Sequence, residues 1–452
     1  MGDPYDRREF LKTAAAGGVG LSLTAARLGA VAPGPQPGAA NLATPPLDTV
    51  RMGFVGVGHQ GSSHVENFLR IDGVEIKAIC DIVPDKVQRM QQLVVEAGQP
   101  EPAGYSRGPD DFRRMCERDD LDLVFTATPW DWHAPVCVAA MENGKHAATE
   151  VPMAVTVDEC WQLVETAERT QRHCVMMENV CYGRLEMMIL NLVRRGLLGE
   201  LLHAECGYLH DLRELKLTDF YEGRWRVKHS VRRNGDLYPT HGLGPVAQYM
   251  NVNRGNRFDY LVSFSSNARG LNRWAAEHIG SNSPEARRSY ALGDVVSTLI
   301  RTVAGQTILV VHDTNSPRPY SRKLTVQGTA GIVQRYPDEK IHIEGRSPAH
   351  QWEDLEAYRA EFDHAVWTTL EERSQGAGHG GMDYIEDYRL VECLRNGTPT
   401  DQDVYDGAAW SAVSGLSERS IANGGRPVEV PDFTRGAWRD RPPLEIVPRE
   451  GE

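Results

Sequence analysis

The sequence lacks the short patterns that mark common metal sites. Its eight cysteines form no Cys-x-x-Cys pair, and no His-Glu-x-x-His segment occurs. Both patterns supply paired ligands at the spacing that a zinc ion requires. No resident metal ion is therefore expected. Cys80, Cys137 and Cys206 stand within apolar runs, where a thiol serves as a small core side chain.

Long apolar runs and basic clusters are missing as well. A membrane-spanning helix needs about 20 consecutive apolar residues, and even the apolar stretch near the N-terminus is short and rich in Gly and Ala. Acidic residues outnumber basic ones by 62 to 49, and no basic stretch is interleaved with aromatic residues. This pattern argues against nucleic acid as a partner and favours a small molecule.

Chain length and composition fit a protein of two ordinary domains. The chain has 452 residues, and its hydrophobic content of 41% is sufficient for two cores. Residues 33–48 form a Pro/Gly/Ala-rich linker. We therefore expect a leader and linker over residues 1–48, followed by two folded domains.

The stretch Arg51–Asp81 has the pattern of a dinucleotide-binding unit. An apolar strand, Met52–Val55, is followed by a Gly-x-Gly-x-x-Gly turn, a helix and a second apolar strand, Val74–Cys80, which ends at a carboxylate. A Gly-rich turn of this kind directs the helix N-terminus at the phosphates, where unpaired N–H groups and the helix dipole favour an anion. The sequence therefore predicts a dinucleotide cofactor.

Each glycine of this turn has a separate function. Gly56 allows the tight turn, Gly58 lets the backbone approach the pyrophosphate, and Gly61 lets the helix pack closely on the sheet. Asp81 stands about 20 residues beyond Gly61, where an acidic side chain accepts hydrogen bonds from the adenosine ribose. Because a carboxylate at this position repels a 2′-phosphate, we expect NAD rather than NADP.

Alternating strands and helices continue to about residue 178, which predicts a parallel sheet wrapped by helices, a Rossmann domain over residues 49–178. The expected elements are helix Ser62–Ile71, helix Asp85–Ala97, helix Asp110–Arg118, strand Leu121–Ala127, helix Ala134–Asn143, strand His146–Thr149, helix Val157–Thr170 and strand Cys174–Met177.

From residue 179 the pattern changes to that of an α+β domain, 179–452, with an open, mostly antiparallel sheet. The Ala304-Gly305 pair predicts a hairpin turn. The expected strands are Leu201–Leu209, Tyr260–Ser265, Val295–Val303, Thr307–Asp313, Leu324–Gln327 and Lys340–Glu344, and the expected helices are Arg184–Arg195, Trp352–Arg373, Met382–Arg395 and Val404–Ala422.

Three loops should meet at the cofactor, because ligands of an open parallel sheet lie beyond the carboxyl ends of its strands. These loops are Thr128–His133, Glu150–Pro152 and Glu178–Tyr182. The first two resemble the Thr-Pro-x-x-x-His loop and the Glu-Lys-Pro turn of the glucose–fructose oxidoreductase and inositol dehydrogenase family. The family lysine is replaced by Val151 here, which argues against simple alcohol oxidation.

The segment Asn234–Gly242 takes the place of that family's Asp-x-x-x-His element. His241 matches the histidine, whereas Leu237 replaces the aspartate and Tyr238 stands three residues before the histidine. Together with the Trp-Asp-Trp-His loop, the Tyr221–Arg226 segment and the Gly378–Asp383 segment, this element resembles glycoside hydrolase family 109, the NAD-dependent α-N-acetylgalactosaminidases.

The resemblance implies a glycosidase that cleaves terminal α-linked N-acetylgalactosamine without net oxidation. Hydride transfer from C3 of the sugar to NAD⁺ acidifies the C2 hydrogen, and the glycosidic oxygen then leaves by elimination. Water adds to the unsaturated intermediate, and the same hydride returns to C3. Such a route is a known exception to the use of two carboxylates by glycosidases.

The resemblance also implies which residues contact each ligand. The substrate contacts are Tyr208, Arg226, Tyr238, Pro239, Thr240, His241 and Tyr320. The contacts with NAD, beyond Gly56 and Gly58, are Gln60, Gly61, Asp81, Trp130, Asp131, Trp132, His133, Glu150, Val151, Asn179 and Tyr238.

Three residues are candidates for proton transfer. His241, as an imidazole, is expected to accept the proton of the C3 hydroxyl. Tyr182, next to the nicotinamide loop, is expected to act as the base at C2 with Tyr238 as its partner, provided that the tyrosine pKa is lowered from about 10. The spacing of Trp130 and Trp132 suggests that one faces the sugar or nicotinamide and the other the core.

The N-terminus predicts export. Residues Asp6–Lys12, DRREFLK, followed by a Gly/Ala-rich apolar stretch, resemble a twin-arginine signal. We expect the twin-arginine machinery to export the folded chain, with its NAD, to the periplasm or beyond. No membrane span is expected after cleavage, and a homo-oligomer is compatible with the sequence. Two other functions remain open: an exported NAD-dependent sugar oxidoreductase with net redox, and a non-catalytic sugar- or NAD-binding module.

Overall fold

The computed structural model of the protein describes residues 38–219 and 223–446. The expected export signal, and Tyr221 and Glu222 of the Tyr221–Arg226 segment, lie outside the described residues. These described residues belong to one compact unit. In the described part of the chain, no helix combines the length and the apolar character that crossing a membrane would require.

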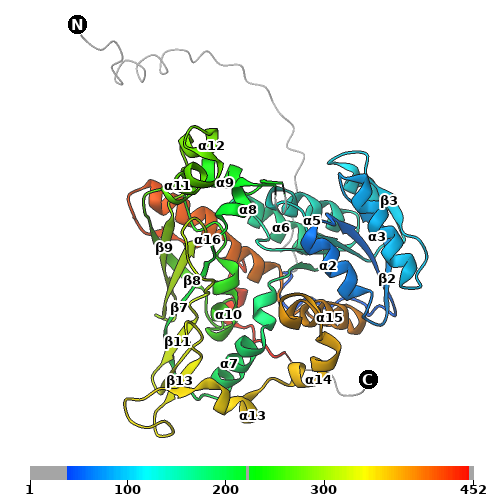
Figure 1. The fold of residues 1–452 in the computed structure, drawn as a ribbon. Helices are drawn as coiled ribbons and strands as arrows, with labels where there is room; N and C mark the ends of the chain where they lie inside the picture. Colours follow the sequence, from blue (N-terminus) through cyan, green and yellow to red (C-terminus); the bar gives the residue numbers. More distant parts are fainter. Residues whose placement is uncertain (1–37, 220–222, 447–452) are drawn as a thin grey trace, which may run out of the picture. The chain divides into compact units, whose positions relative to one another are not determined.

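The N-terminal half contains a six-stranded, all-parallel sheet in the order β3-β2-β1-β4-β5-β6 (Figure 1). This order reverses between β1 and β4, the place where such sheets bind ligands. The elements are β1 Val50–Val55, α2 His59–Phe68, β2 Val74–Cys80, α3 Pro84–Glu96, β3 Ala103–Tyr105, α4 Asp111–Cys116, β4 Leu123–Thr126, α5 His133–Glu142, β5 His146–Thr149, α6 Val157–Thr170 and β6 Cys174–Met176. The predicted Rossmann domain is confirmed.

The second half contains a nine-stranded sheet in the order β14-β13-β12-β11-β7-β10-β9-β8-β15. Only β7 and β10 pair in parallel among its described strands, so the expected mostly antiparallel sheet is confirmed. The strands are β7 Leu201–Leu209, β8 Phe258–Ser265, β9 Val295–Thr302, β10 Thr307–Asp313, β11 Thr325–Gly328, β12 Gly331–Gln334, β13 Lys340–Ile343, β14 Glu353–Asp354 and β15 Val428–Glu429.

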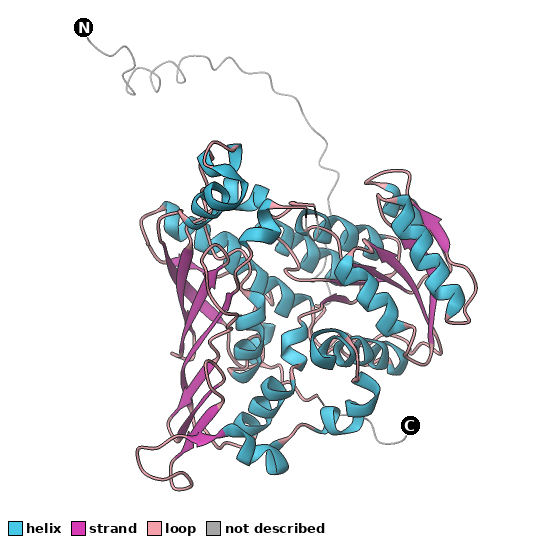
Figure 2. Ribbon diagram, in the orientation of Figure 1, coloured by secondary structure: helices cyan, strands magenta, loops and turns pink. Residues whose placement is uncertain are grey.

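Helices of the second half cover the inner face of this sheet and reach the Rossmann domain (Figure 2). Helix α10 packs on β7, α16 packs on β8 and α6, and α15 packs on α2. The helices are α7 Arg184–Arg194, α8 Arg213–Leu217, α9 Val227–Arg232, α10 Thr240–Tyr249, α11 Gly270–Ala275, α12 Pro284–Arg287, α13 Arg359–Phe362, α14 Ala365–Ser374, α15 Met382–Asn396 and α16 Val404–Ala422.

The expected single helix Trp352–Arg373 is wrong. The chain instead forms β14, a 3-10 turn, α13 and α14. Asp363 breaks the helix with an extended backbone (ψ 145°), and the side chain of His364 then caps α14 by accepting from the N–H of Val366 at 3.2 Å. The carboxylate of Asp363 is held by Arg184, 2.6 Å away, so a tertiary ion pair fixes the break.

Helix α10, which carries His241, was not expected as a helix because it contains Gly242, Gly244 and Pro245. These residues ordinarily weaken a helix. The packing of α10 on β7 requires glycine at position 242, because a Cβ there would lie 2.3 Å from the backbone nitrogen of Gly207 in β7. The glycine therefore permits α10 to lie directly on the sheet, which places His241 at the strand's end.

Candidate active site

The Gly-rich turn has the geometry that a dinucleotide requires. Gly56 has φ +81°, a conformation that favours glycine, and a Cβ on Gly61 would lie 2.0 Å from the carbonyl oxygen of Gly56. Gly58 is the N-cap of α2, which has no side-chain cap, and a Cβ there would meet nothing closer than the Lys86 ammonium at 3.7 Å. The N–H groups of α2 thus face open space, which fits a pyrophosphate.

Asp81 lies beside this turn, at the carboxyl end of β2. Its two carboxylate oxygens accept hydrogen bonds from the N–H groups of Val57 and Val83, each at 2.9 Å. These bonds fix the orientation of the carboxylate where the sequence places the adenosine ribose. The residues present therefore fit NAD.

The two tryptophans of the loop after β4 face opposite ways. Trp130 stacks on Tyr238 with ring centroids 5.4 Å apart and an interplanar angle of 22°. Trp132 packs edge-on against Phe112, at 6.1 Å, in the Rossmann core. Trp130 is therefore the tryptophan on the site side, and Trp132 anchors the loop.

Asp131 and His133 connect this loop to other segments. The carboxylate of Asp131 pairs with the ammonium of Lys228 in α9. His133 is 1% exposed, and its ring nitrogens lie 2.8 Å from the carbonyl oxygens of Pro152 and Thr128. The side chain of His133 therefore joins the loop after β4 to the loop after β5, and it positions both.

A buried charged cluster ties the cofactor domain to α15. His64 of α2 lies 2.9 Å from a carboxylate oxygen of Glu150 and 2.9 Å from one of Asp387. Burial alone would lower the pKa of His64, but the two carboxylates raise it well above its usual value. Glu150 also accepts from the N–H of Val151, whose side chain is 3% exposed. Position 151 therefore contributes no amine to the site, unlike the lysine of the Glu-Lys-Pro turn.

His241 has a carboxylate partner that the sequence analysis did not identify. Its Nδ1 lies 2.6 Å from Oε1 of Glu178, a side chain with no exposed surface, while the imidazole itself is 14% exposed. A carboxylate accepts from Nδ1–H, so Nε2 remains as the nitrogen that can accept a proton. Leu237 stands where the Asp-x-x-x-His element has its aspartate. Glu178, which follows β6, is the carboxylate partner of His241 instead.

Tyr208 and Tyr238 surround His241. The rings of Tyr238 and His241 are 4.9 Å apart and those of Tyr208 and His241 are 5.3 Å apart. Burial, with a smaller effect of Glu150, raises the pKa of Tyr238 well above its usual value. Tyr238 therefore forms a neutral aromatic wall beside His241, and the expected lowering of a tyrosine pKa by the nicotinamide ring stays a prediction.

A cleft of about 920 Å³ opens at His241. Its lining includes Tyr208, Tyr320, Asn179 and His379, so residues expected at the sugar and at NAD share one cavity. The hydroxyl of Tyr320, a side chain 40% exposed, accepts a hydrogen bond from Arg322 at 3.1 Å.

Asp383 organises one wall of this cleft. Its carboxylate oxygens lie 2.8 Å from Nδ1 of His379, 2.7 Å from Nδ2 of Asn179 and 3.2 Å from Nε2 of Gln60. Burial would raise the pKa of Asp383, but His379, His64 and Asn179 lower it to about 2, while the Asp383 carboxylate raises the pKa of His379. His379 and Asp383 thus form a second histidine–carboxylate pair, which the Gly378–Asp383 segment signalled only as a motif.

Tyr182 lies apart from the cleft of His241. Its hydroxyl donates to Asp401 at 3.2 Å, and the side chain lines a small internal cavity with Arg389. Burial and the charge of Asp401 raise its pKa well above the usual value. This geometry favours a structural role for Tyr182 behind the loop after β6, and its role as the base at C2 stays a prediction.

Pro239 and Thr240 form the start of α10. Pro239 is the N-cap residue, and Thr240 has no exposed surface and no partner for its hydroxyl among the described residues. The expected contact of Thr240 with the sugar stays a prediction. Both residues begin the helix that carries His241.

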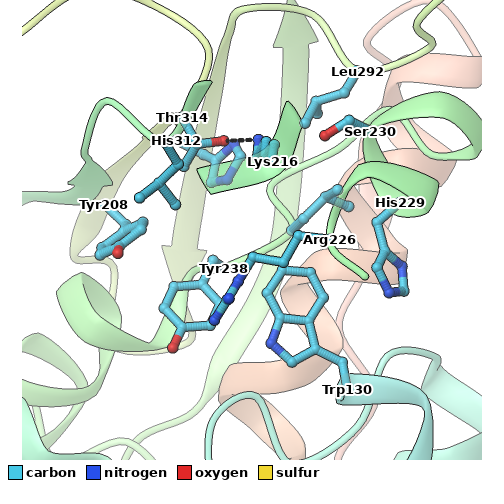
Figure 3. A pocket seen from close by; sticks show the side chains of 12 residues that line it. Trp130, Tyr208, Lys216, Arg226, His229, Ser230, Tyr238, Leu292, His312 and Thr314 are labelled. Atoms are coloured by element: carbon cyan, nitrogen blue, oxygen red, sulfur yellow. Dashed lines mark hydrogen bonds between the residues drawn. The ribbon is translucent and has the colours of Figure 1, made fainter. Parts of the chain in front are cut away.

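Arg226 lies with Trp130 and Tyr238 at a second, smaller cavity (Figure 3). Its guanidinium carbon lies 4.2 Å from the ring centroid of Trp225 and 5.9 Å from that of Trp130. Among the described residues, no group of three or more His, Cys, Asp and Glu side chains is arranged to hold a metal ion.

Two family models match the chain. Residues 50–178 match the NAD-binding Rossmann fold of an oxidoreductase family, and residues 182–440 match the C-terminal domain of glycosyl hydrolase 109. Solved structures with a similar fold include a levoglucosan dehydrogenase in complex with NADH (TM-score 0.66, 19% identity, 85% of this chain and 99% of that one). Another is an inositol dehydrogenase homologue from Azotobacter vinelandii complexed with NAD⁺ (TM-score 0.64, 21% identity, 86% and 99%).

Relatives of known family cover the full chain. A glycosyl hydrolase family 109 protein of Shewanella pealeana is 49% identical over 98% of this chain and 99% of its own length. A family 109 protein of Shewanella sp. strain MR-4 is also 49% identical, over 98% of each chain. The resemblance noted from the sequence is confirmed, and the cofactor is NAD. With a Rossmann domain at its N-terminus and the matching catalytic domain after it, the chain belongs to glycosyl hydrolase family 109.

Proposed function

We propose that the protein hydrolyses terminal α-linked N-acetylgalactosamine through a transient ketone at C3 of the sugar. C3 loses a hydride and its hydroxyl proton, C2 then loses a proton while the C1–O bond breaks, and water adds across C1 and C2. Return of the hydride and a proton to C3 restores the sugar, so the net reaction is hydrolysis. NAD, when bound, supplies the hydride acceptor and donor for C3.

One observation carries this proposal: the acid–base groups of the cleft are histidines. His241 with Glu178 and His379 with Asp383 both line it. Among the described lining residues the only carboxylate is that of Glu371, which is paired with Arg184 at 2.7 Å. Hydrolysis by two opposed carboxylates would need a pair of acids across the bond, so the cleft is better suited to proton transfer by histidine.

Two of the three histidines among the described lining residues have separate roles, while the third, His210, has its Nδ1 3.0 Å from the hydroxyl of Tyr208. His241 accepts the C3 hydroxyl proton on Nε2, and the buried Glu178 carboxylate stabilises the positive charge that results. His379 is the second proton-transfer group, at C2 or at the departing oxygen, because Asp383 holds its Nδ1 and leaves Nε2 for the cleft. Tyr238 and Trp130 form the aromatic wall that orients the sugar.

Incorporation of deuterium tests the mechanism. Hydrolysis of an aryl α-N-acetylgalactosaminide in D₂O, without added cofactor, should place deuterium at C2 of the released sugar. The absorbance of reduced nicotinamide should show no net increase at completion. Product without deuterium at C2 would contradict the elimination, and stoichiometric accumulation of reduced cofactor would favour a sugar oxidoreductase instead.

Export as a folded protein is a second part of the proposal, and the DRREFLK segment supports it. Replacing Arg7 and Arg8 together by lysine should lower the periplasmic fraction of the protein by about tenfold or more. The total amount of folded protein in the cell should not fall. An unchanged periplasmic fraction, measured by immunoblot of fractionated cells, would contradict export by this route.

A further inference from the structure

A second cavity of about 30 Å³ adjoins the cleft. Tyr208 lines both cavities, whereas Arg226 and Trp130 line the smaller one and His241 lines the larger. A sugar that contacts both Arg226 and His241 must therefore extend a substituent toward the small cavity. A space of this size holds one or two water molecules, or a ligand group of comparable size.

Lys216 of α8 closes the far end of this cavity (Figure 3). The side chain is 4% exposed, and Nζ donates to Oγ1 of Thr314 at 2.6 Å and to Oδ1 of Asn315 at 2.8 Å. An ammonium group has three N–H donors, so one N–H of Lys216 remains for a ligand. Within the described ranges, no carboxylate lies within 4.0 Å of Nζ. The amine is thus buried with neutral partners alone.

The rest of the lining shows which ligand group fits. His312 of β10 is 3% exposed, and its Nδ1 has no hydrogen-bond partner among the described residues. Three leucines, Leu212, Leu237 and Leu292, supply an apolar wall. A buried donor beside a small apolar wall is complementary to a neutral group with one acceptor oxygen and one methyl.

We propose that this cavity receives the acylamino substituent at C2 of the sugar, and that Lys216 determines specificity by donating to its carbonyl oxygen. The acyl methyl packs against the leucines. This inference rests on the proposed function, whose substrate it deepens. The third donor of Lys216 is present when the amine is protonated, and burial, and then the charge of Arg226, lower the pKa of Lys216 to about 7.

Lys216→Met tests the assignment, since methionine keeps most of the aliphatic stem and removes the donor. We compare kcat/KM for aryl 2-acetamido and aryl 2-hydroxy galactosides. The variant should lose about tenfold to a hundredfold with the 2-acetamido substrate and less than about threefold with the 2-hydroxy substrate. Lys340→Met, on the surface strand β13, is the matched control and should change neither. Equal losses with both substrates would overturn the inference.

A substrate series tests the same cavity without mutation and serves if Lys216→Met does not fold. The wild-type holoenzyme is assayed with N-formyl, N-acetyl, N-propionyl and N-butyryl galactosaminides. Because the cavity is small, kcat/KM should fall at least about tenfold from acetyl to butyryl. A butyryl substrate as good as the acetyl substrate would place the acyl group elsewhere and overturn the inference.

A binding measurement separates this inference from the proposed function. Free N-acetylgalactosamine and galactose are titrated into the holoenzyme by calorimetry. The wild type should prefer N-acetylgalactosamine by about tenfold or more, and Lys216→Met should lose that preference. If no glycoside is cleaved but this shift appears, the proposed function fails and the cavity assignment stands. A preference that survives in Lys216→Met overturns the assignment, whatever the activity.

Discussion

Glu178→Gln is the sharpest test of the His241 pair. Oε1 of Glu178 accepts from Nδ1 of His241 at 2.6 Å and also from the N–H of Val180 at 3.2 Å. Because the N–H of Val180 can only donate, a glutamine at 178 keeps its oxygen at this position. The imidazole tautomer is therefore retained, and the substitution removes the negative charge and puts an amide NH2 in place of Oε2, which has no hydrogen-bond partner among the described residues.

The size of the effect follows from that geometry. Hydrogen bonds to charged groups contribute about 1.5–3 kcal/mol and neutral ones about 1 kcal/mol. The difference of about 0.5–2 kcal/mol corresponds to a decrease of about 2-fold to 30-fold in kcat. Glu178→Ala removes the acceptor as well, and should lower kcat by about 10²–10⁴-fold, the usual range for a misplaced acid or base.

The assay measures kcat, KM and the amount of NAD released from denatured protein. For Glu178→Gln, kcat should fall while KM and NAD content stay within about twofold of the wild type. Glu205→Gln on β7, where the carboxylate pairs with Lys323 at the surface, is the control and should retain full activity. If Glu178→Gln is as active as the wild type, His241 does not acquire a proton in the rate-limiting step, and its assigned role is wrong.

The remaining predictions concern the cofactor, the core and pH. Asp81→Ala should reduce NAD retention and raise the share of bound NADP, as measured by chromatography of released nucleotides; unchanged nucleotide preference would contradict the ribose assignment. Tyr182→Phe should lower kcat by less than about threefold but lower the free energy of unfolding by about 1–3 kcal/mol, because it removes a buried hydrogen bond to a carboxylate that Arg389 still contacts; a loss of 10² in kcat would support its role as a base. Asp383→Asn should destabilise the protein most between about pH 4 and 6.5, as denaturant titrations over pH can measure. The lowered pKa of Asp383, about 2, makes its stabilisation vanish as pH falls toward that value, and the raised pKa of His379 makes the stabilisation vanish as pH rises through it. A destabilisation independent of pH would show that the two residues are not linked.

The elements of the Rossmann domain could be predicted well because residues close together in the sequence determine them. The strands β2 and β5 and the helix α6 have the predicted bounds, since apolar runs and a Thr–Glu capping box mark them directly. Element ends shifted where turns decide them: α2 begins at His59 rather than Ser62. Short edge strands such as β3, three residues long, carry no periodicity that a sequence could show.

The partners of the site histidines were not predictable in the same way. Glu178 and Asp383 stand 63 and 4 residues from the histidines that they contact. The sequence around Glu178 or Asp383 does not indicate which histidine each carboxylate contacts. The reason is that α10 and α15 are brought to the Rossmann strand ends only by tertiary packing. The missing aspartate at Leu237 could have indicated that His241 has another carboxylate partner, since a buried imidazole still needs a hydrogen-bond acceptor.

The placement of His241 shows why local propensity failed at the most informative element. Gly242 lies so close to Gly207 that a Cβ on Gly242 would be 2.3 Å from the backbone nitrogen of Gly207. Any larger residue at 242 would push α10 away from β7 and so displace His241 relative to Glu178, which follows β6. Gly242, which weakens α10 as a helix, is therefore the residue that lets it approach the sheet. Catalytic geometry and helix propensity oppose each other here, and the tertiary contact decides the outcome.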